Sequence, residues 1–440
     1  MSASSDRRLV AGCLLGSFIG TEAPDWVLRS IADGLGGVLL FAQNIVDDAQ
    51  VSRLCGQLRG ARPDVVIAID EEGGDVTRLD AVTGSETPSP AAFGYVDDVR
   101  STTDSYRRLG YRIANLGIDL VLAPCADINS NPLNPIIGVR SFGTTGDLVA
   151  RHVAAAIDGF HEAGLTACAK HFPGHGDTSA DTHRGPARVD ASRAVLTQRE
   201  LVPFAAAVGA GVDAILTAHI IAEAFDREPA SLSTAWTAHL RQEMDFDGVI
   251  ITDALDMDAV AHGRGIAGVA DAAVRALDAG ADFLCLGSNF DESMTDTVID
   301  QVVAAVVDGR LNPGQLQNSV ERISTLCGAH AIVADTTRLD DDPVAERAIA
   351  VDGSMPTGSY AVLECRPPGS QACWNVSWGI AGMLGERGWP VATMCESDAV
   401  EPACAAFLET AGTLPILVVV RDALVHKWQT RVVDLLTDVR

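Results

Sequence analysis

Short apolar runs rich in Val, Ile and Leu recur along the first two thirds of the chain. Most of them are followed by a stretch with helical spacing of apolar residues, for example 148–161, 201–208 and 269–277. Strands that alternate with helices in this way imply parallel pairing. We expect eight such strands, near 9–16, 37–42, 65–70, 120–127, 165–171, 214–219, 249–253 and 282–287.

Eight strand-helix units predict an α/β fold of the (β/α)8 TIM-barrel type, because an open doubly wound sheet usually has fewer strands. We place this barrel at residues 1–335 and an acidic linker at 336–358, which ends in a cluster of Pro, Gly and Ser. A small C-terminal α/β domain is expected at 359–440. Three strands are few for an independent sheet, so this domain is either a natural short form or truncated. Its strands are expected at 360–365, 389–393 and 416–421.

Composition narrows the class of partner. The formal charge of -27 repels nucleic acid and anionic membrane surfaces, and the Lys and Arg residues form no run. The chain has no run of 18 apolar residues, so we expect no membrane span. Residues 10–13 imitate a lipoprotein cleavage box, but polar residues precede them where an apolar stretch is needed. A neutral small molecule is the expected partner, bound by a monomer or weak homodimer.

The ten cysteines are scattered, and several lie inside apolar runs, as small buried residues do. No CxxC motif or Cys/His spacing typical of a metal site occurs. We therefore expect no metal, no cofactor and a reducing, cytoplasmic location.

Polar residues stand at the carboxyl ends of the expected strands, where barrel enzymes keep their chemistry. The densest group is at 170–183. Within it Asp181 and His183 are two residues apart, so in an extended loop both side chains point to one side and can share a hydrogen bond. A solvated polar loop is the alternative. The strand-end residues are Asp70, Asp127, Lys170, His171, His219 and Asp253.

Asp253 and the Asp181/His183 pair have the chemistry of a retaining glycosidase. That mechanism needs a carboxylate nucleophile and a nearby acid/base. A helix cap is the competing explanation for an Asp after a strand, and it suits Asp256 or Asp258 better than Asp253. From the residues alone we infer a barrel enzyme that uses carboxylate and imidazole groups.

Four segments resemble glycoside hydrolase family 3, in its β-N-acetylhexosaminidase branch that acts in peptidoglycan recycling. They are DEEGG at 70–74, RSFG at 140–143, KHFPGHGDT at 170–178 with DTH at 181–183, and TDAL at 252–255. The resemblance covers residues from about 5 to 330. Two departures are the Thr between Asp and His, where Ser is more usual, and the shorter C-terminal domain.

The resemblance implies a retaining β-N-acetylglucosaminidase that hydrolyses terminal β-linked N-acetylglucosamine from peptidoglycan-derived or chitin-derived sugars. Asp253 is the implied nucleophile, through a covalent glycosyl-Asp intermediate. His183 is the implied acid/base and Asp181 its orienting partner. The implied sugar-binding residues are Asp70, Arg78, Arg140, Lys170 and His171.

Two other functions remain open at this point. A β-N-acetylglucosaminide or β-glucoside phosphorylase would use the same site with phosphate as acceptor, since a neutral imidazole repels phosphate less than a carboxylate does. A sugar-binding module without activity would require the loss of Asp253 or His183, and both are present.

Overall fold

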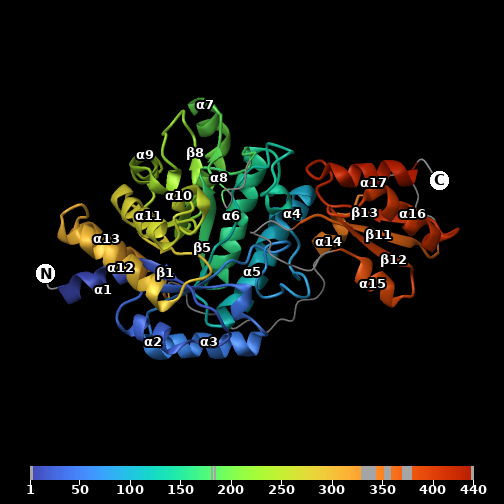
Figure 1. The fold of residues 1–440 in the computed structure, drawn as a ribbon. Coiled ribbons are helices and arrows are strands. Elements are labelled where there is room, and N and C mark those ends of the chain that lie inside the picture. Colours follow the sequence, from blue (N-terminus) through green and yellow to red (C-terminus); the bar gives the residue numbers. More distant parts are fainter. Residues whose placement is uncertain are drawn as a thin grey trace.

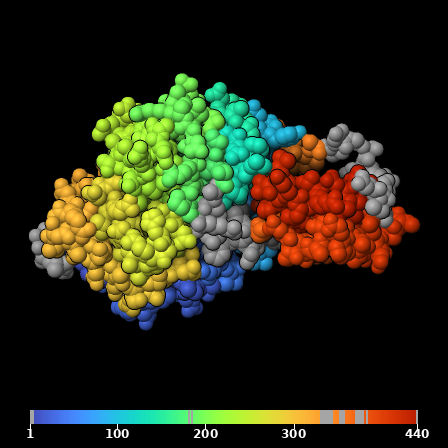
Figure 2. All heavy atoms as spheres, turned by 45° about the horizontal axis from the view of Figure 1, so that its top comes forward, coloured from blue at the N-terminus to red at the C-terminus, as the bar shows by residue number. Residues whose placement is uncertain are grey.

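The computed structural model describes residues 3–179, 182, 185–328, 343–350, 358–368 and 379–437. They form a large α/β barrel followed by a small α/β domain at the C-terminal end (Figure 1). In the space-filling view the C-terminal domain lies directly beside the barrel (Figure 2). Among the described residues, no helix combines the length and apolar character that crossing a bilayer requires.

The eight barrel strands all pair in parallel, in the order β10-β1-β2-β3-β4-β5-β7-β9. A parallel bridge between Ile251 and Phe283 joins the two ends of this order, which closes the sheet. The expected (β/α)8 fold is confirmed. The strands are β1 (Leu14–Gly16), β2 (Gly37–Leu40), β3 (Val66–Ile69), β4 (Leu120–Val121), β5 (Thr166–Phe172), β7 (Ala214–Thr217), β9 (Val249–Thr252) and β10 (Leu284–Cys285).

Helices surround the barrel because their apolar faces are buried against it. In α5 the buried residues Thr102, Tyr106, Leu109 and Ile113 recur every three or four positions, and Asp98 caps the helix by accepting from the Ser101 amide. The α-helices are α1 (Ala3–Gly12), α2 (Asp25–Ala32), α3 (Asp48–Ala61), α4 (Pro90–Val96), α5 (Val99–Asn115), α6 (Gly146–Glu162), α7 (Arg193–Val195), α8 (Val202–Gly209), α9 (Thr234–Ala238), α10 (Asp258–Ala261), α11 (Ile266–Ala279), α12 (Glu292–Val307) and α13 (Pro313–Ser324).

Short irregular helices fill several connections. Three are 3₁₀ turns and two are π-turns. They are η1 (Ala42–Asn44), η2 (Gly138–Arg140), η3 (Leu196–Glu200), η4 (Ala230–Leu232) and η5 (His239–Glu243). Of these, η2 matters most for the site because it ends at Arg140.

The first expected strand is partly wrong. The chain is helical up to Gly12, and β1 begins only at Leu14. Helix α1 contacts α12 and α13, and Arg7 of α1 forms ion pairs with Asp296 and Asp300. A short apolar run does not distinguish a buried helix from a buried strand, and here one run contains the end of a helix and the whole of a strand.

The barrel interior is filled by apolar side chains from alternate strands. Phe283 is fully buried there and leaves no room for a side chain at Gly37, where a Cβ would lie 2.8 Å from the Phe283 ring. The cluster consists mainly of Leu15, Leu39, Val66, Ala68, Leu120, Leu122, Cys168, Leu216, Val249, Ile251 and Phe283.

The expected C-terminal α/β domain is also confirmed. Strands β11 (Ala361–Arg366), β12 (Val391–Cys395) and β13 (Ile416–Val419) form a parallel sheet in the order β12-β11-β13. Its helices are α15 (Ala381–Glu386), α16 (Val400–Ala411) and α17 (Lys427–Thr437), and its core includes Leu363, Met394, Phe407 and Val432.

The domain limits at 335 and 359 remain predictions. Within the expected linker the described residues include helix α14 (Pro343–Arg347), which contacts α4 of the barrel. Arg347 forms an ion pair with Asp98, 3.0 Å between Nη1 and Oδ2. This part of the linker is therefore attached to the barrel.

A short second sheet was not expected. Strand β6 (Ala187–Arg188) pairs in parallel with β8 (Ile220–Ile221). Strand β6 follows the segment that contains the expected acid/base pair, and β8 follows β7. This pairing ties the end of the long β5–β6 connection to the rim of the barrel.

Candidate active site

The site residues come from strands whose carboxyl ends lie at the same rim of the barrel. Asp70 directly follows β3, Lys170 and His171 lie in β5, and Asp253 directly follows β9. Because all eight strands are parallel, their carboxyl ends meet there. The sequence therefore places these side chains at one end of the barrel, and the structure shows which of them touch.

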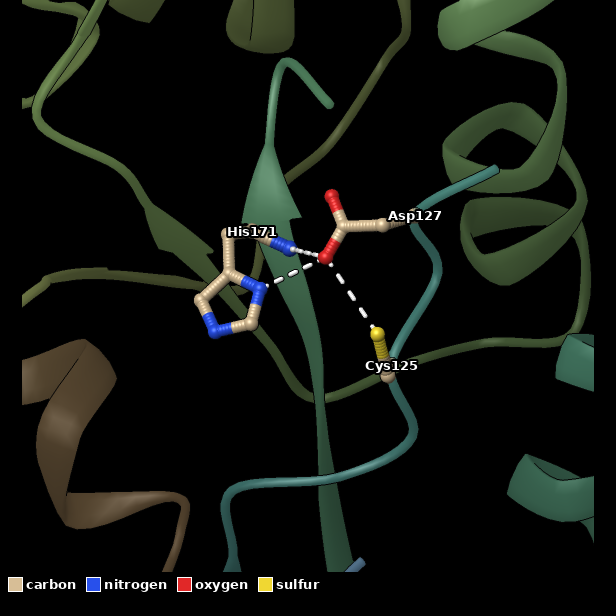
Figure 3. A group of neighbouring side chains, drawn as sticks. All are labelled: Cys125, Asp127 and His171. Atoms are coloured by element: carbon tan, nitrogen blue, oxygen red, sulfur yellow. Dashed lines mark hydrogen bonds and ion pairs between the residues drawn. The ribbon is translucent and has the colours of Figure 1, made fainter. Parts of the chain in front are cut away.

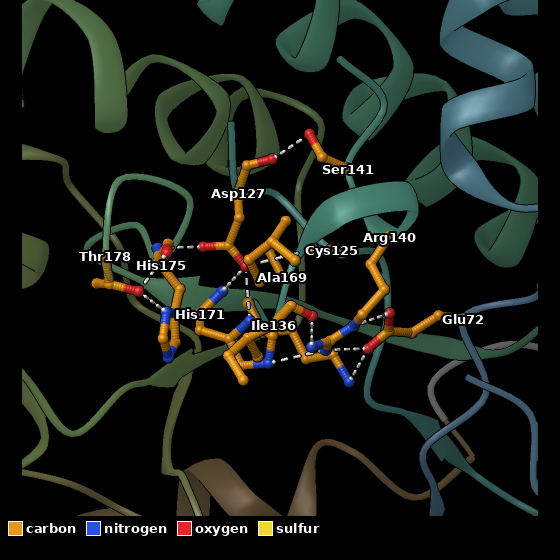
Figure 4. Close-up of polar contacts among 12 residues, drawn as sticks. Glu72, Cys125, Asp127, Ile136, Arg140, Ser141, Ala169, His171, His175 and Thr178 are labelled. Carbon is orange, nitrogen blue, oxygen red and sulfur yellow. Dashed lines mark hydrogen bonds and ion pairs between the residues drawn. The ribbon is translucent and has the colours of Figure 1, made fainter. Parts of the chain in front are cut away.

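Five charged side chains form a continuous network at this rim. Arg78 Nη2 lies 2.6 Å from Asp70 Oδ2, and Lys170 binds both Asp70 and Glu72, with 2.6 Å between its Nζ and Glu72 Oε1. Arg140 holds Glu72 in a bidentate pair, 2.9 Å from Nε and 2.7 Å from Nη2 (Figure 4). Each charge is thus held in place by a charge of opposite sign.

The pKa values follow from these contacts. Burial alone would raise the pKa of Asp70, but Lys170 and Arg78 outweigh burial and hold it below its usual value. Burial likewise opposes ionisation of Glu72, and Arg140 and Lys170 reverse this and lower its pKa strongly. Burial would lower the pKa of Lys170, but Asp70 and Glu72 raise it. All these groups are ionised at neutral pH.

His171 continues the network. Its Nε2 lies 3.1 Å from Arg140 Nη2, and its Nδ1 lies 2.6 Å from Asp127 Oδ2. A guanidinium only donates hydrogen bonds, so Nε2 accepts and the proton is on Nδ1, which donates to Asp127. The orientation of His171 is therefore fixed, and its ring is held between a carboxylate and a guanidinium.

Asp127 organises this part of the site. Its Oδ2 accepts from the His171 amide at 3.2 Å, and its Oδ1 accepts from the His175 amide at 2.6 Å. Burial alone would raise the pKa of Asp127, but His171 and the other donors lower it to about 2. One carboxylate thus fixes both the end of β5 and the start of the following loop.

Cys125, Asp127 and His171 form a cluster that could in principle bind a metal ion, because their ligand atoms lie within 4.8 Å of one another. Burial holds the pKa of the Cys125 thiol well above its usual value, so the thiol is protonated, and it donates to Asp127 at 3.3 Å. The Asp127–His171 contact also carries a proton (Figure 3). The donor set fits a hydrogen-bonded cluster better than metal coordination.

The loop after β5 is held by buried polar contacts. His175 Nδ1 lies 2.6 Å from Thr178 Oγ1, and Asn134 Nδ2 donates to the carbonyl oxygens of both residues, at 2.8 and 2.9 Å. Burial lowers the pKa of His175 to about 4, so this ring is neutral. Thr182 Oγ1 lies 3.5 Å from His175 Nε2. Asp181 and His183, on either side of Thr182, lie outside the described residues.

Asp253 is half-buried and fixed by the backbone. Its amide donates to the Thr217 carbonyl at 2.9 Å, and its Oδ1 accepts from the Ala254 amide at 2.8 Å. Helix α10 begins five residues later and has Met257 at its N-cap position. Asp253 therefore does not cap that helix.

His219, which the sequence also placed at a strand end, supports the turn after Asp253. Its Nε2 lies 2.8 Å from the Ala254 carbonyl oxygen, which only accepts, so Nε2 donates. Its Nδ1 then accepts from Ser231 Oγ at 2.7 Å. Both ring nitrogens are occupied, and we assign His219 a structural role.

The structure thus brings together all five expected sugar-binding residues in one network. Sequence reasoning assigned no role to two members, Glu72 and Asp127. Glu72 stands two positions after Asp70, and this spacing was the available signal. Asp127 was noted at a strand end, but only the fold shows that it holds His171.

Comparison with known proteins places the chain among glycoside hydrolases. The model of the glycosyl hydrolase family 3 N-terminal domain matches residues 22–326. β-Hexosaminidase A of Pseudoalteromonas piscicida is 33% identical over 320 residues, which cover 66% of this chain and 53% of that protein. This chain thus spans about half the length of that relative. The β-hexosaminidase of Xylella fastidiosa strain M23 is 32% identical over 314 residues, 70% of this chain and 89% of the relative.

Solved structures agree with the sequence relatives. A family 3 β-N-acetylglucosaminidase from Paenibacillus sp. str. FPU-7 has a TM-score of 0.85 and 31% identity, and the match covers 98% of this chain and 87% of that one. Native NagZ from Neisseria gonorrhoeae has a TM-score of 0.59 and 25% identity, over 71% of this chain and 97% of that one. The first similarity therefore includes the C-terminal domain.

Proposed function

Because this chain belongs to glycosyl hydrolase family 3, we propose that it hydrolyses terminal β-linked N-acetylglucosamine from small carbohydrates, with retention of configuration. The observation that carries the proposal is the charged network at the barrel rim, in which Asp70, Arg140, Lys170 and His171 are held at the same end of the barrel as Asp253. The relatives are named β-hexosaminidases, and the Paenibacillus structure is named a β-N-acetylglucosaminidase, which supports the proposal.

The network suits a neutral, hydroxyl-rich ligand. Its carboxylates Asp70, Glu72 and Asp127 balance the cations of Arg78, Arg140 and Lys170. Charge-assisted hydrogen bonds from such groups orient sugar hydroxyls and discriminate against analogues that lack them. Since each group is already fixed by its neighbours, little ordering is needed when the sugar binds.

Asp253 is the proposed nucleophile. In a retaining glycosidase a carboxylate oxygen bonds to the anomeric carbon as the bond to the leaving oxygen breaks, and water later hydrolyses the glycosyl ester. The Thr217 and Ala254 contacts fix Asp253 at the end of β9. A carboxylate fixed in this way is preorganised for attack.

The general acid must come from outside the network. Asp70, Glu72 and Asp127 have lowered pKa values and cannot supply a proton near neutral pH. Burial raises the pKa of Glu71 to about 7, but its side chain is fully buried and bound to the amides of Arg78 and Leu79.

We therefore propose His183 as the acid/base and Asp181 as the residue that orients its ring. The contact of Thr182 with His175 supports this role, since Thr182 lies between the two in the sequence. A second observation supports this role. Strand β6 follows Asp181 and His183 in the sequence, and its pairing with β8 holds this part of the chain at the barrel rim.

Peptidoglycan or chitin fragments are the proposed source of the substrate, and a cytoplasmic monomer or weak homodimer the proposed form. The described cysteines are all free, which supports a reducing compartment.

The test is product analysis on p-nitrophenyl β-N-acetylglucosaminide and β-glucoside, with and without inorganic phosphate. Free N-acetylglucosamine whose release does not depend on phosphate is expected. A sugar 1-phosphate formed only with phosphate would replace the hydrolase by a phosphorylase. Trapping with a fluorinated sugar and mapping the labelled peptide tests the nucleophile separately, and a label away from Asp253 would refute its role.

A further inference from the structure

The C-terminal domain reaches the barrel through the loop between β13 and α17. Arg421, in this loop, forms an ion pair with Asp75 of the barrel. The backbone of Arg421 is fixed by Gln429 of α17, which accepts from its amide at 2.9 Å and donates to its carbonyl at 2.6 Å. Gln429 is fully buried. The guanidinium is therefore presented to the barrel from a well-held backbone.

Asp75 lies at the tip of the hairpin turn that carries much of the charged network. The Glu72 amide donates to the Val76 carbonyl at 2.9 Å, which closes the turn. Asp70 and Glu72 lie on one side of this turn and Arg78 on the other. Whatever holds Asp75 thus also holds the segment that positions these three residues.

The same loop of the C-terminal domain also lies near a second segment of the site. Asp422 Oδ1 is 3.7 Å from the place where a Cβ on Gly138 would stand. Gly138 is the first residue of η2, which ends at Arg140. Two neighbouring residues of one domain therefore face two of the barrel segments that supply the network.

We propose that Arg421 is a positioning residue for sugar binding, so that the C-terminal domain forms part of the working site. This inference rests on the proposed function and extends it to residues outside the barrel. Arg421 acts by neutralising Asp75 and fixing the 72–76 turn, and through this turn it sets the position of Asp70 and Glu72.

The charges around Asp75 indicate what the loss of Arg421 would do. Burial raises the pKa of Asp75, Arg421 opposes this, Asp422 adds to it and Arg140 opposes it more weakly. Without Arg421, burial and Asp422 would raise the pKa of Asp75 further, so that Asp75 becomes neutral. The 72–76 turn would then lose the ion pair that ties it to the C-terminal domain.

The experiment compares the full-length protein with its Arg421→Gln variant on p-nitrophenyl β-N-acetylglucosaminide. We expect KM to rise about tenfold with a smaller change in kcat, because binding groups are displaced while the nucleophile stays. Arg421→Lys should restore part of the affinity. Asp75→Asn should act in the same direction, and the double variant should be no worse than the stronger single variant.

Arg431→Gln is the matched control, because Arg431 is on α17 of the same domain and forms an exposed pair with Glu401 at 3.3 Å. It should leave KM unchanged. An unchanged KM in Arg421→Gln, or an equal rise in the control, would overturn the positioning role. A fall in melting temperature that is matched by an equal loss of kcat and no change in KM would also overturn it, in favour of a purely structural contact. If the wild-type protein releases no sugar at all, the proposed function fails and this inference with it.

Discussion

The two ends of the barrel use the same residue types for different purposes. At the carboxyl ends of the strands, Asp70, Glu72 and Asp127 bind the side chains of arginine, lysine and histidine. At the amino ends, Asp119 and Asp213 each accept from a backbone amide of the neighbouring strand at 2.9 Å, those of Ile67 and Ala167.

Asp282 shows the second pattern most fully. Its Oδ2 accepts from the Ile250 amide at 2.9 Å and from Arg241 at 2.5 Å, and its Oδ1 binds Ser319 and Arg322 at 2.7 and 3.2 Å. Asp119, Asp213 and Asp282 each precede a strand and bind the start of the strand beside it. Carboxylates at this end therefore join strands, whereas those at the other end position side chains that can meet a ligand.

The largest effect is expected at Asp253. Asp253→Ala should lower kcat/KM by about 10⁴-fold or more on every substrate, because no other group can bond to the anomeric carbon. Kinetics with p-nitrophenyl β-N-acetylglucosaminide measures this, and the melting temperature should stay close to that of the wild type. Near-normal turnover would remove Asp253 from the mechanism.

The next effect tests the acid/base. His183→Ala should slow substrates with poor leaving groups by about 10²- to 10⁴-fold and activated aryl glycosides less, since a poor leaving group needs the proton most. Asp181→Ala should give a milder form of this pattern, and the two losses should not add. A series of aryl glycosides provides the measurement. Equal slowing of good and poor leaving groups would make His183 a binding residue.

Asp282 should show the opposite behaviour. Asp282→Ala removes the buried carboxylate that Arg241, Arg322 and the Ile250 amide share, so it should lower the free energy of unfolding by about 3–5 kcal/mol. The kcat/KM of the protein that remains folded should not change. Urea denaturation measures the loss.

The control for this variant is Asp271→Ala, because Asp271 pairs with Arg264 on the surface and its side chain is 47% exposed. That substitution should lower the free energy of unfolding by only about 0–1 kcal/mol. Lost activity in folded Asp282→Ala would contradict the division between the two ends.

A smaller effect concerns Glu200, which packs against Gly174 in the loop after β5. Burial raises its pKa from 4.5 to about 7 against the opposing influence of Arg199. Within the described part of the chain, its Oε2 has no hydrogen-bond partner. The folded state therefore holds a proton that the unfolded state has lost, and stability falls as pH rises from 4.5 to about 7.

Glu200→Gln should abolish this dependence of stability on pH. At pH 8 its free energy of unfolding should exceed that of the wild type by on the order of 2 kcal/mol. Denaturation at a series of pH values measures it. The control is Glu162→Gln, whose side chain is 51% exposed and pairs with Arg107. A slope that persists in Glu200→Gln would assign it to another group.

The smallest effect is expected from removing metal. Dialysis against a chelator should leave activity unchanged, because Cys125, Asp127 and His171 are hydrogen-bonded to one another rather than arranged to bind a metal ion. Loss of activity that a divalent ion restores would show that this cluster is a metal site.

The sequence predicts much of this molecule because periodicity and strand-end position depend on nearby residues. All eight barrel strands and the three C-terminal strands overlap the expected runs, although the first run also contains the end of helix α1. The partner of Glu72 could not be predicted, since Arg140 is 68 residues away and their meeting depends on the closed sheet. Asp282 shows the same limit: the sequence places it at the start of an expected strand, but its partners Arg241 and Arg322 are each about 40 residues away and meet it only in the folded barrel.

The balance of charge in the network bears on the choice of acceptor. The network is nearly neutral, but it lies in a protein with a formal charge of -27. The negative electrostatic potential of the protein does not hinder the approach of a neutral sugar. It repels a phosphate ion, and dissolved salt weakens this repulsion by screening the surface charges. Ionic strength therefore separates the two chemistries: water as acceptor makes turnover insensitive to added salt, and an anionic acceptor makes turnover faster as salt is added.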